Sequence, residues 1–237
     1  MLKVYSRTFP IQVSNCDMHG RLKVSELFRF MQECAMEHAE LMGVGMEPMH
    51  KLNRTFVLSR MKINVLKMPC FGDELEIKTY PFGIERLFYV REFEIKANDV
   101  KAAEAKSLWL VINLENRRPV RDRDFGQDFP RVANENVDMD SPVKPSVPED
   151  AGEIMRRRVG YSDVDILGHA NNSAYVAWTC DCIGSEFFKD NTAYSVTINY
   201  SSELSEGEYV RIIGEDMLFK GINESGKESF SAMVERL

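Results

Sequence analysis

The sequence predicts an α+β fold of two similar units, each a long helix wrapped by an antiparallel sheet, joined side by side as an internal pseudo-dimer. Three observations predict it. The order of one strand, one long helix and four strands occurs twice along the chain. Short motifs recur in the same order in both halves. A helix covers only one face of a sheet, and two copies that continue one sheet remove two exposed edges.

The first half carries the longer elements. Residues 3–14 alternate as a strand does, and apolar residues over 24–42 recur at helical spacing. The aromatic and β-branched residues that follow predict four strands, near 55–67, 73–82, 86–97 and 101–114. Turns are expected at Phe82-Gly83 and at Asn98-Asp99.

The second half repeats this order in shorter form. It predicts a strand near 154–161, a helix over about 172–188, and strands near 193–201, 208–213, 216–222 and 228–236. Between the halves, prolines and acidic residues with few large apolar residues indicate a linker. We therefore divide the chain into a first unit at 1–125, a linker at 126–152 and a second unit at 153–237.

Residue matches support an internal duplication. Asp17-Met-His-Gly20 aligns with Asp165-Ile-Leu-Gly168. Farther along, Ile63-Asn64 matches Ile198-Asn199, and Gly72-Asp73 matches Gly207-Glu208. Each match is short, and their shared order makes duplication the better interpretation.

The composition is that of a globular protein. Of 237 residues, 44% are hydrophobic and 28% are charged, and no apolar run approaches the roughly 18 residues of a membrane span. The N-terminus lacks the apolar core of a signal peptide, so we expect a cytoplasmic protein. The net charge of −7 argues against nucleic acid as a partner. No phosphate-binding glycine loop or metal-ligand spacing occurs, so we expect no cofactor and no metal.

One run concentrates the residues that carry chemistry, Asp163-Val-Asp165-Ile-Leu-Gly168-His169-Ala-Asn171-Asn172. A carboxylate and an imidazole can activate water, and N–H groups at a helix start can hold a developing oxyanion. Taken singly, Asp165 is more readily explained as a turn or capping residue, and His169 as a hydrogen-bonded structural histidine. Asp163 is interpreted as a structural acid.

These segments resemble the acyl-acyl carrier protein thioesterases, which are tandem hotdog proteins. The resemblance rests on residues 57–63, 72–74, 83–88 and 113–121 in the first half, and on 163–175 and 196–200 in the second. It implies a double hotdog fold and hydrolysis of the thioester between a fatty acyl chain and acyl carrier protein, with release of free fatty acid. The acylated carrier protein would be the partner, and its fatty acyl thioester the substrate.

The resemblance also implies site residues. The family motif resembles Asp-x-Asn-x-His-x-x-Asn followed one strand later by Glu, and its positions fall on Asp165, His169, Asn172 and Glu203. The first Asn of the motif falls on Leu167, which removes an amide that could bind the carbonyl or position water. A cysteine nucleophile after the Glu has no support, because that position is Leu204.

The first copy of the motif lacks this chemistry. Arg21 and Met68 stand at the positions that match His169 and Glu203, although the aspartate and the glycine of the motif are kept. We therefore expect a first half that binds the acyl chain without catalysing the reaction, and a catalytic second half.

The resulting hypothesis is a water-activating site at the start of the second long helix. Asp165 or Glu203, assisted by His169, would activate the water. The substrate carbonyl and its oxyanion would be held near Gly168, Asn171 and Asn172.

Three other functions stay open at this point. A hotdog acyl-CoA thioesterase would share the site and use a different carrier. A hotdog dehydratase would use a histidine and an acid on a hydroxyacyl substrate, although the two amides after His169 and the later glutamate favour hydrolysis. Leu167 keeps open a non-catalytic acyl-binding or carrier-binding module. The acyl chain length, and whether the protein is a monomer or a homodimer, do not follow from the sequence.

Two arginine clusters are candidates for docking the acidic carrier: Arg117, Arg118, Arg121 and Arg123, and the run Arg156-Arg157-Arg158. The alternative for both is a solvated surface run of charge.

Overall fold

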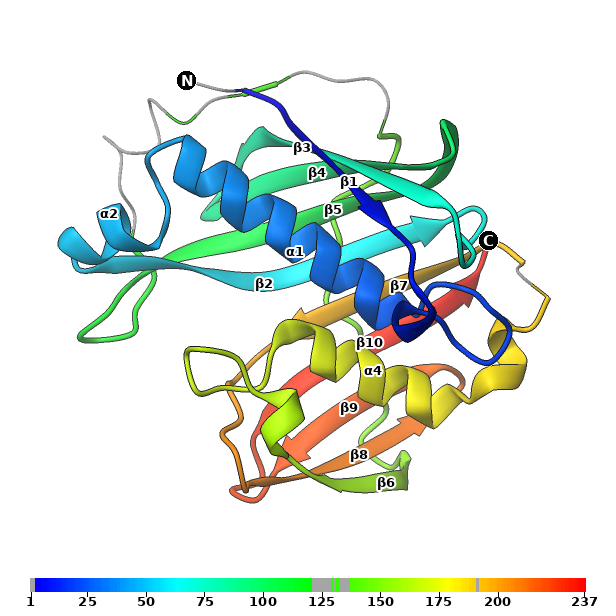
Figure 1. Cartoon of the computed structure of the whole chain (residues 1–237). Coiled ribbons are helices and arrows are strands. Elements are labelled where there is room, and N and C mark those ends of the chain that lie inside the picture. Colours follow the sequence, from blue (N-terminus) through cyan, green and yellow to red (C-terminus); the bar gives the residue numbers. More distant parts are fainter. Residues whose placement is uncertain (1–2, 121–128, 130, 133–136, 191) are drawn as a thin grey trace.

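The computed structural model describes residues 3–120, 129, 131–132, 137–190 and 192–237. Within this part of the chain, one antiparallel sheet of ten strands organises the molecule (Figure 1). The strand order is β1-β3-β4-β5-β2 in the first half, and it continues as β7-β10-β9-β8-β6 in the second. Counted outward from the β2–β7 junction, the strands of the two halves therefore follow one another in equivalent order.

The elements follow the duplicated order that the sequence predicts. The first half contains β1 (Tyr5–Pro10), α1 (Val24–Leu41), α2 (Met46–Lys51), β2 (Arg54–Val65), β3 (Glu74–Glu85), β4 (Phe88–Ala97) and β5 (Val100–Asn113). The second contains β6 (Gly152–Arg158), α4 (Asn172–Ile183), β7 (Tyr194–Tyr200), β8 (Tyr209–Glu215), β9 (Leu218–Asn223) and β10 (Glu228–Arg236). Short 3-10 helices lie at Val13–Asn15, Tyr161–Asp163 and Ser185–Phe188.

The two halves are joined where β2 pairs with β7. The antiparallel register runs from Arg60 opposite Asn199 to Val65 opposite Tyr194. On the side toward the helices, the paired residues are buried and apolar, including Ile63 opposite Val196. These buried pairs fix the register, because a slip of one residue would turn them to the other face. The predicted continuation of one sheet across both halves is confirmed.

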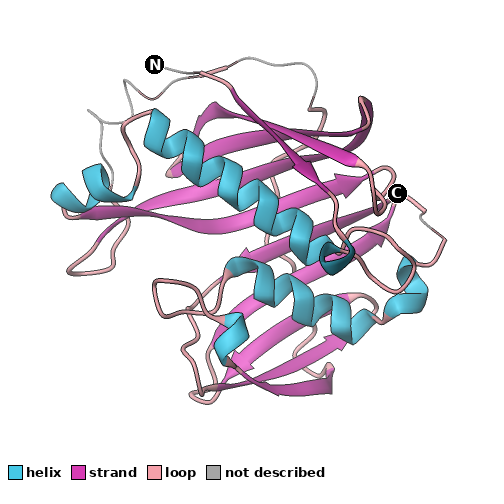
Figure 2. Cartoon of the chain, in the orientation of Figure 1, coloured by secondary structure: helices cyan, strands magenta, loops and turns pink. Residues whose placement is uncertain are grey.

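Both long helices cover the same face of this sheet (Figure 2). They also contact each other, so the core is continuous from one half to the other. Its largest fully buried side chains come from α1, α4 and the strands beneath them, among them Leu27, Met31, Trp178, Phe93 and Phe230. The alternating strands and the amphipathic α1 bury these residues because one face of each element points into the core.

Residues 137–151 cross the opposite face of the sheet. The Arg60 side chain donates to the carbonyl of Pro142 at 2.8 Å, and Lys106 donates to the carbonyl of Met139 at 2.7 Å. Lys144 forms an ion pair with Glu228 at 2.9 Å. This part of the predicted linker is therefore an ordered strap that contacts strands of both halves.

Three local predictions differ from the structure. The second long helix was expected to reach residue 188, but α4 ends at Ile183 because Gly184 adopts a φ of +84. Helix α2 was not predicted. The turn expected at Phe82-Gly83 lies instead between β3 and β4, where Arg86 has a φ of +58. Gly83 marks a register shift within the β3–β4 pair. The turn at Asn98-Asp99 is confirmed.

Asp163 is a structural acid, as the sequence suggested. Its carboxylate accepts hydrogen bonds from the backbone N–H of Gly160 at 2.8 Å and from the indole of buried Trp178 at 3.3 Å. It also pairs with Arg157 at 3.1 Å, and only 8% of Asp163 is exposed. The acid therefore ties the turn before α4 to the helix itself.

Replacing Asp163 with alanine should lower the free energy of unfolding by about 2–4 kcal/mol, because it removes the acceptor of the buried indole N–H and of the Gly160 N–H and the buried partner of Arg157. Asp181→Ala is the matched control. Asp181 pairs with the same Arg157 at 3.4 Å, but its side chain is 55% exposed, so its loss should cost less than about 1 kcal/mol. Denaturant unfolding of the two variants measures the difference, and equal losses would contradict the structural role.

Candidate active site

The turn that precedes α4 presents the predicted acid and imidazole. The Asp165 N–H donates to the carbonyl of His169 at 2.9 Å, and Val164 pairs with Ala170 around them. Gly168 completes the turn with a φ of +78, a conformation that costs a glycine little. One carboxylate oxygen of Asp165 accepts the N–H of Leu167 at 2.9 Å. Asp165 thus stabilises the turn that places His169.

The first half contains the same turn with different side chains. The Asp17 N–H donates to the carbonyl of Arg21 at 2.7 Å, and Gly20 has a φ of +72. The Asp17 carboxylate accepts backbone N–H groups of the turn, as Asp165 does. Where the second half has His169, the first has Arg21, whose guanidinium donates to the carbonyl of Phe188. The backbone of the motif is duplicated, and its imidazole is not.

Glu203 is the carboxylate that faces the imidazole. It lies after β7, and its Oε2 is 3.5 Å from His169 Nε2. The same oxygen accepts a hydrogen bond from Nη2 of Arg117, which lies in the turn after β5. The side chains of His169 and Glu203 are 35% and 45% exposed, so the pair is open to water. Asp165 lines the same pocket, and the described residues show no side-chain bond between it and His169.

The amides and the glycine have distinct positions. Asn171 is the N-cap of α4, and its Oδ1 accepts the N–H of Ser173 at 2.9 Å. Asn172 is the first helical residue, its side chain lines the pocket, and its Nδ2 lies 3.5 Å from Oε1 of Gln32 on α1. Gly168 and Asn171 do not line the pocket. Of the three predicted binding residues, the structure brings only Asn172 to the cavity wall.

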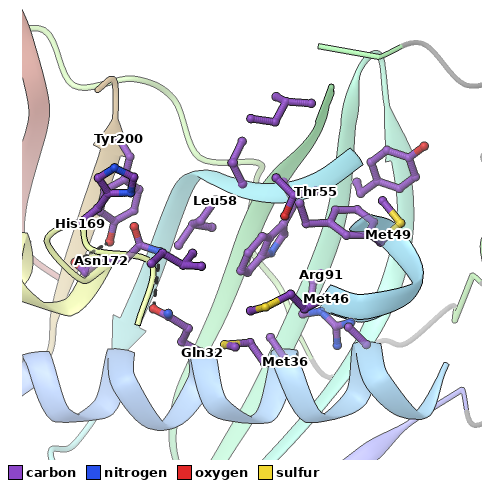
Figure 3. Close-up of a pocket in the computed structure, with 18 of the residues that line it drawn as sticks. Gln32, Met36, Met46, Met49, Thr55, Leu58, Arg91, His169, Asn172 and Tyr200 are labelled. Atoms are coloured by element: carbon purple, nitrogen blue, oxygen red, sulfur yellow. Dashed lines mark hydrogen bonds between the residues drawn. The ribbon is translucent and has the colours of Figure 1, made fainter. Parts of the chain in front are cut away.

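A cavity of about 660 Å³ begins beside this site and runs between α1 and β2 (Figure 3). His169 and Asn172 lie at one end of it, and Met46, Met49 and Arg91 lie toward the other. The wall between them is largely apolar and aromatic, with Met36, Phe56, Leu58 and Trp109 among the side chains that form it. An extended apolar ligand attached to a polar group would fit this lining.

The sheet opens this space where the two halves separate. Pairing of β2 with β7 stops at Arg60, and a register shift between Leu58 and Arg60 bends β2 at that point. Residues 55–58 of β2 lie beyond the shift and line the cavity. The bulge therefore places the apolar chamber beside the junction of the two halves.

Arg91 brings a buried positive charge to the far end. It is 7% exposed, and its Nη1 lies 2.9 Å from His38 Nδ1 and 3.2 Å from Thr79 Oγ1. Burial lowers the pKa of the Arg91 guanidinium to about 10. Among the described residues, no carboxylate forms an ion pair with it. The chamber therefore ends against a desolvated cation.

Several residues of the site were not assigned to it from the sequence. The sequence assigns Arg117 to the docking arginines and assigns no role to Tyr175. Both line the cavity with Gln32 and Tyr200. The Tyr200 hydroxyl donates to the carbonyl of Asn172 at 3.0 Å, which fixes the start of α4. Gln32 lies three and four positions before the lining residues Ala35 and Met36, so these three side chains share one face of α1.

The arginine clusters differ in their environment. Arg117 is committed to Glu203, and Arg118 is exposed on the same turn. Arg121 and Arg123 lie outside the described residues. In the second cluster, Arg157 pairs with Asp163 and Asp181, and the Arg156 guanidinium lies 5.2 Å from the centre of the Tyr209 ring.

Among the described residues, no group of three or more His, Cys, Asp or Glu side chains could hold a metal ion. No helix in the same part of the chain has the length and hydropathy needed to cross a membrane.

Two family models match the chain. The model of the acyl-ACP thioesterase N-terminal domain matches residues 2–124, and that of the acyl-ACP thioesterase C-terminal domain matches residues 147–235. Together they cover most of the sequence. The chain therefore belongs to the acyl-ACP thioesterase family, as its motifs suggested.

Curated relatives agree with this placement. The chain is 26% identical over 226 residues to an oleoyl-acyl carrier protein thioesterase of Coriandrum sativum, and the match covers 87% of this chain and 61% of the relative. It is 23% identical over 225 residues to a dodecanoyl-[acyl-carrier-protein] hydrolase of Umbellularia californica, covering 88% and 58%. The chain thus spans about three fifths of the length of these relatives.

Solved structures share the fold over nearly the full length of the chain. An acyl-ACP thioesterase from Bacteroides thetaiotaomicron superposes with a TM-score of 0.87 at 23% identity, covering 98% of this chain and 97% of that one. A 12:0-ACP thioesterase from Umbellularia californica gives 0.81 at 20% identity, covering 99% and 98%. The predicted double hotdog fold is confirmed.

Proposed function

We propose that the chain hydrolyses fatty acyl thioesters of acyl carrier protein to free fatty acid and the carrier thiol. The observation that carries the proposal is the continuity of the cavity: an apolar chamber leads directly to the His169–Glu203 pair. Membership of the acyl-ACP thioesterase family supports the substrate class. The first unit would hold the acyl chain and the second would carry out the reaction.

In the proposed reaction, the acyl chain lies in the chamber and the thioester carbonyl stops beside Asn172. The backbone N–H of this first helical residue and its side-chain amide are the donors for the developing oxyanion. The positive end of the α4 dipole favours the same charge. This arrangement narrows the oxyanion hypothesis to Asn172, because Asn171 uses its side chain to cap the helix.

Water is activated at the mouth of the chamber. The Glu203 carboxylate faces the imidazole of His169. Together the two groups accept one proton from the water molecule as its oxygen attacks the carbonyl carbon. The carbon–sulfur bond then breaks, and the same proton is returned to the leaving thiolate. Asp165 lines the pocket and stabilises the turn that presents His169. Its proposed role is therefore to position His169.

Asp165→Ala, His169→Ala and Glu203→Gln should each reduce kcat for an acyl-carrier thioester by about 10²–10⁴-fold, because His169 and Glu203 form the water-activating pair and Asp165 holds the turn that positions His169. Release of free fatty acid from carrier thioesters measures the effect. Glu206→Gln is the control, since Glu206 is exposed three residues after Glu203 and does not line the cavity. Rates like those of the wild type in both Asp165→Ala and His169→Ala would contradict the assignment.

The chamber should set the preferred acyl chain length. Leu58 lies in the middle of its wall, so Leu58→Trp should shorten the available space and lower kcat/KM for long chains more than for short ones. A panel of carrier thioesters of different length measures the shift. Leu66→Trp is the control, because Leu66 is 42% exposed and lies outside the chamber. An unchanged length profile in a variant with a normal melting transition would rule out this chamber as the acyl site.

The carrier itself should be recognised by the arginines of the segment that follows β5 in the sequence. Arg118→Glu and Arg121→Glu should weaken hydrolysis of the acidic carrier substrate and spare a small soluble thioester of the same acyl chain. The loss should also diminish at high salt. Comparison with the acyl-CoA thioester tests whether the carrier or coenzyme A is preferred. Equal losses on the carrier and the small thioester would contradict docking at these arginines.

A further inference from the structure

Arg117 is a residue of the first half that reaches the proposed site of the second. It follows β5, and its Nη2 donates to Oε2 of Glu203. That oxygen is also the atom that faces Nε2 of His169, at 3.5 Å. The guanidinium of Arg117 and the imidazole of His169 therefore face the same carboxylate oxygen of Glu203, at the mouth of the cavity.

The turn after β5 holds Arg117 in an uncommon backbone conformation. Its φ is +57, in the left-handed region that non-glycine residues rarely adopt. The Arg117 N–H donates to the carbonyl of Asn113 at 3.0 Å. The Asn113 side chain accepts the N–H groups of Glu115 and Asn116, each at 3.0 Å. The asparagine thus builds a compact turn that fixes the direction in which Arg117 leaves the backbone.

Glu203 needs such an anchor. Its side chain is 45% exposed and has several rotatable bonds, so an unpaired carboxylate would move among rotamers in water. A charge-assisted bond to a guanidinium selects one of these arrangements. Because both side chains of this ion pair are about half exposed, the pair adds little to the stability of the fold. Its main physical effect is on where the carboxylate lies.

From this geometry we infer that Arg117 is a positioning residue, which holds the Glu203 carboxylate against His169 and so couples the first half to the chemistry of the second. The inference rests on the proposed function, because it gives Arg117 a role through Glu203. It also differs from the role expected from sequence, in which Arg117 docks the carrier. A docking arginine would matter only for the carrier substrate, whereas a positioning arginine matters for every thioester.

The test uses the full chain and a small soluble acyl thioester beside the acyl-carrier thioester. Arg117→Gln should lower kcat between about tenfold and a hundredfold on both substrates, with KM for the small thioester unchanged. Arg117→Lys should recover part of the loss, because an ammonium can still pair with the carboxylate. In a Glu203→Gln background, Arg117→Gln should have no further effect.

Arg211→Gln is the matched control. Arg211 pairs with Glu153 at 3.7 Å, and the exposed fractions of the two side chains, 53% and 46%, are close to those of the Arg117–Glu203 pair, 51% and 45%. This variant should keep the activity of the wild type on both substrates. The melting temperatures of all variants should stay close to that of the wild type, which separates a loss of positioning from a loss of fold.

Three results would overturn the inference: wild-type kcat in Arg117→Gln, a loss confined to the carrier substrate, or additive losses in the double variant. Glu203→Gln alone distinguishes this failure from failure of the proposed function. If Glu203→Gln is impaired and Arg117→Gln is not, only the positioning role is wrong. If Glu203→Gln hydrolyses both substrates at the wild-type rate, the proposed role of Glu203 is wrong, and the inference fails with it.

Discussion

The pairing of β2 with β7 is the constraint on which the rest of the structure depends. It makes one sheet out of two, so α1 and α4 must lie on the same face and share a core. It also determines where the cavity opens, because pairing stops at Arg60 and β2 bends away. The mouth of the chamber therefore collects residues from both halves, with Arg117 from one and Glu203 from the other. Two separate hotdog units would not bring these side chains together.

The two copies of the turn distinguish the residues that its backbone conformation requires from those that a reaction would use. In both copies an aspartate accepts N–H groups of the turn, and a glycine supplies a positive φ. These features are required for the turn to form, whatever its function. The residue after the glycine is under no such requirement, and it is Arg21 in one copy and His169 in the other. The difference between the copies therefore identifies the imidazole as the part that the turn itself does not explain.

The sequence predicted the strands, α1 and the repeated order of elements along the chain, because burial of one face imposes a regular period on each element. It did not predict α2, which has only six residues and contains Pro48, so no periodicity could develop. The motif before α4 was found because its residues are neighbours in the chain. Arg117 and Glu203 are 86 positions apart, and no local pattern links them. The position of Arg91 at the cavity was not predicted for a similar reason, because its place in the alternation of β4 is that of any strand residue.

The chamber and the cation at its end both oppose stability. An open apolar space forfeits the contacts that a filled core would make, and a buried guanidinium without a carboxylate partner among the described residues is costly to desolvate. Methionines line part of the wall, and their unbranched side chains can adjust to a flexible ligand. If the proposed function holds, the acyl chain supplies the missing apolar contacts while it is bound. Binding would then stabilise the folded protein by an amount that grows with the logarithm of the ligand concentration above its dissociation constant, because the ligand fills space that the protein's own side chains leave open.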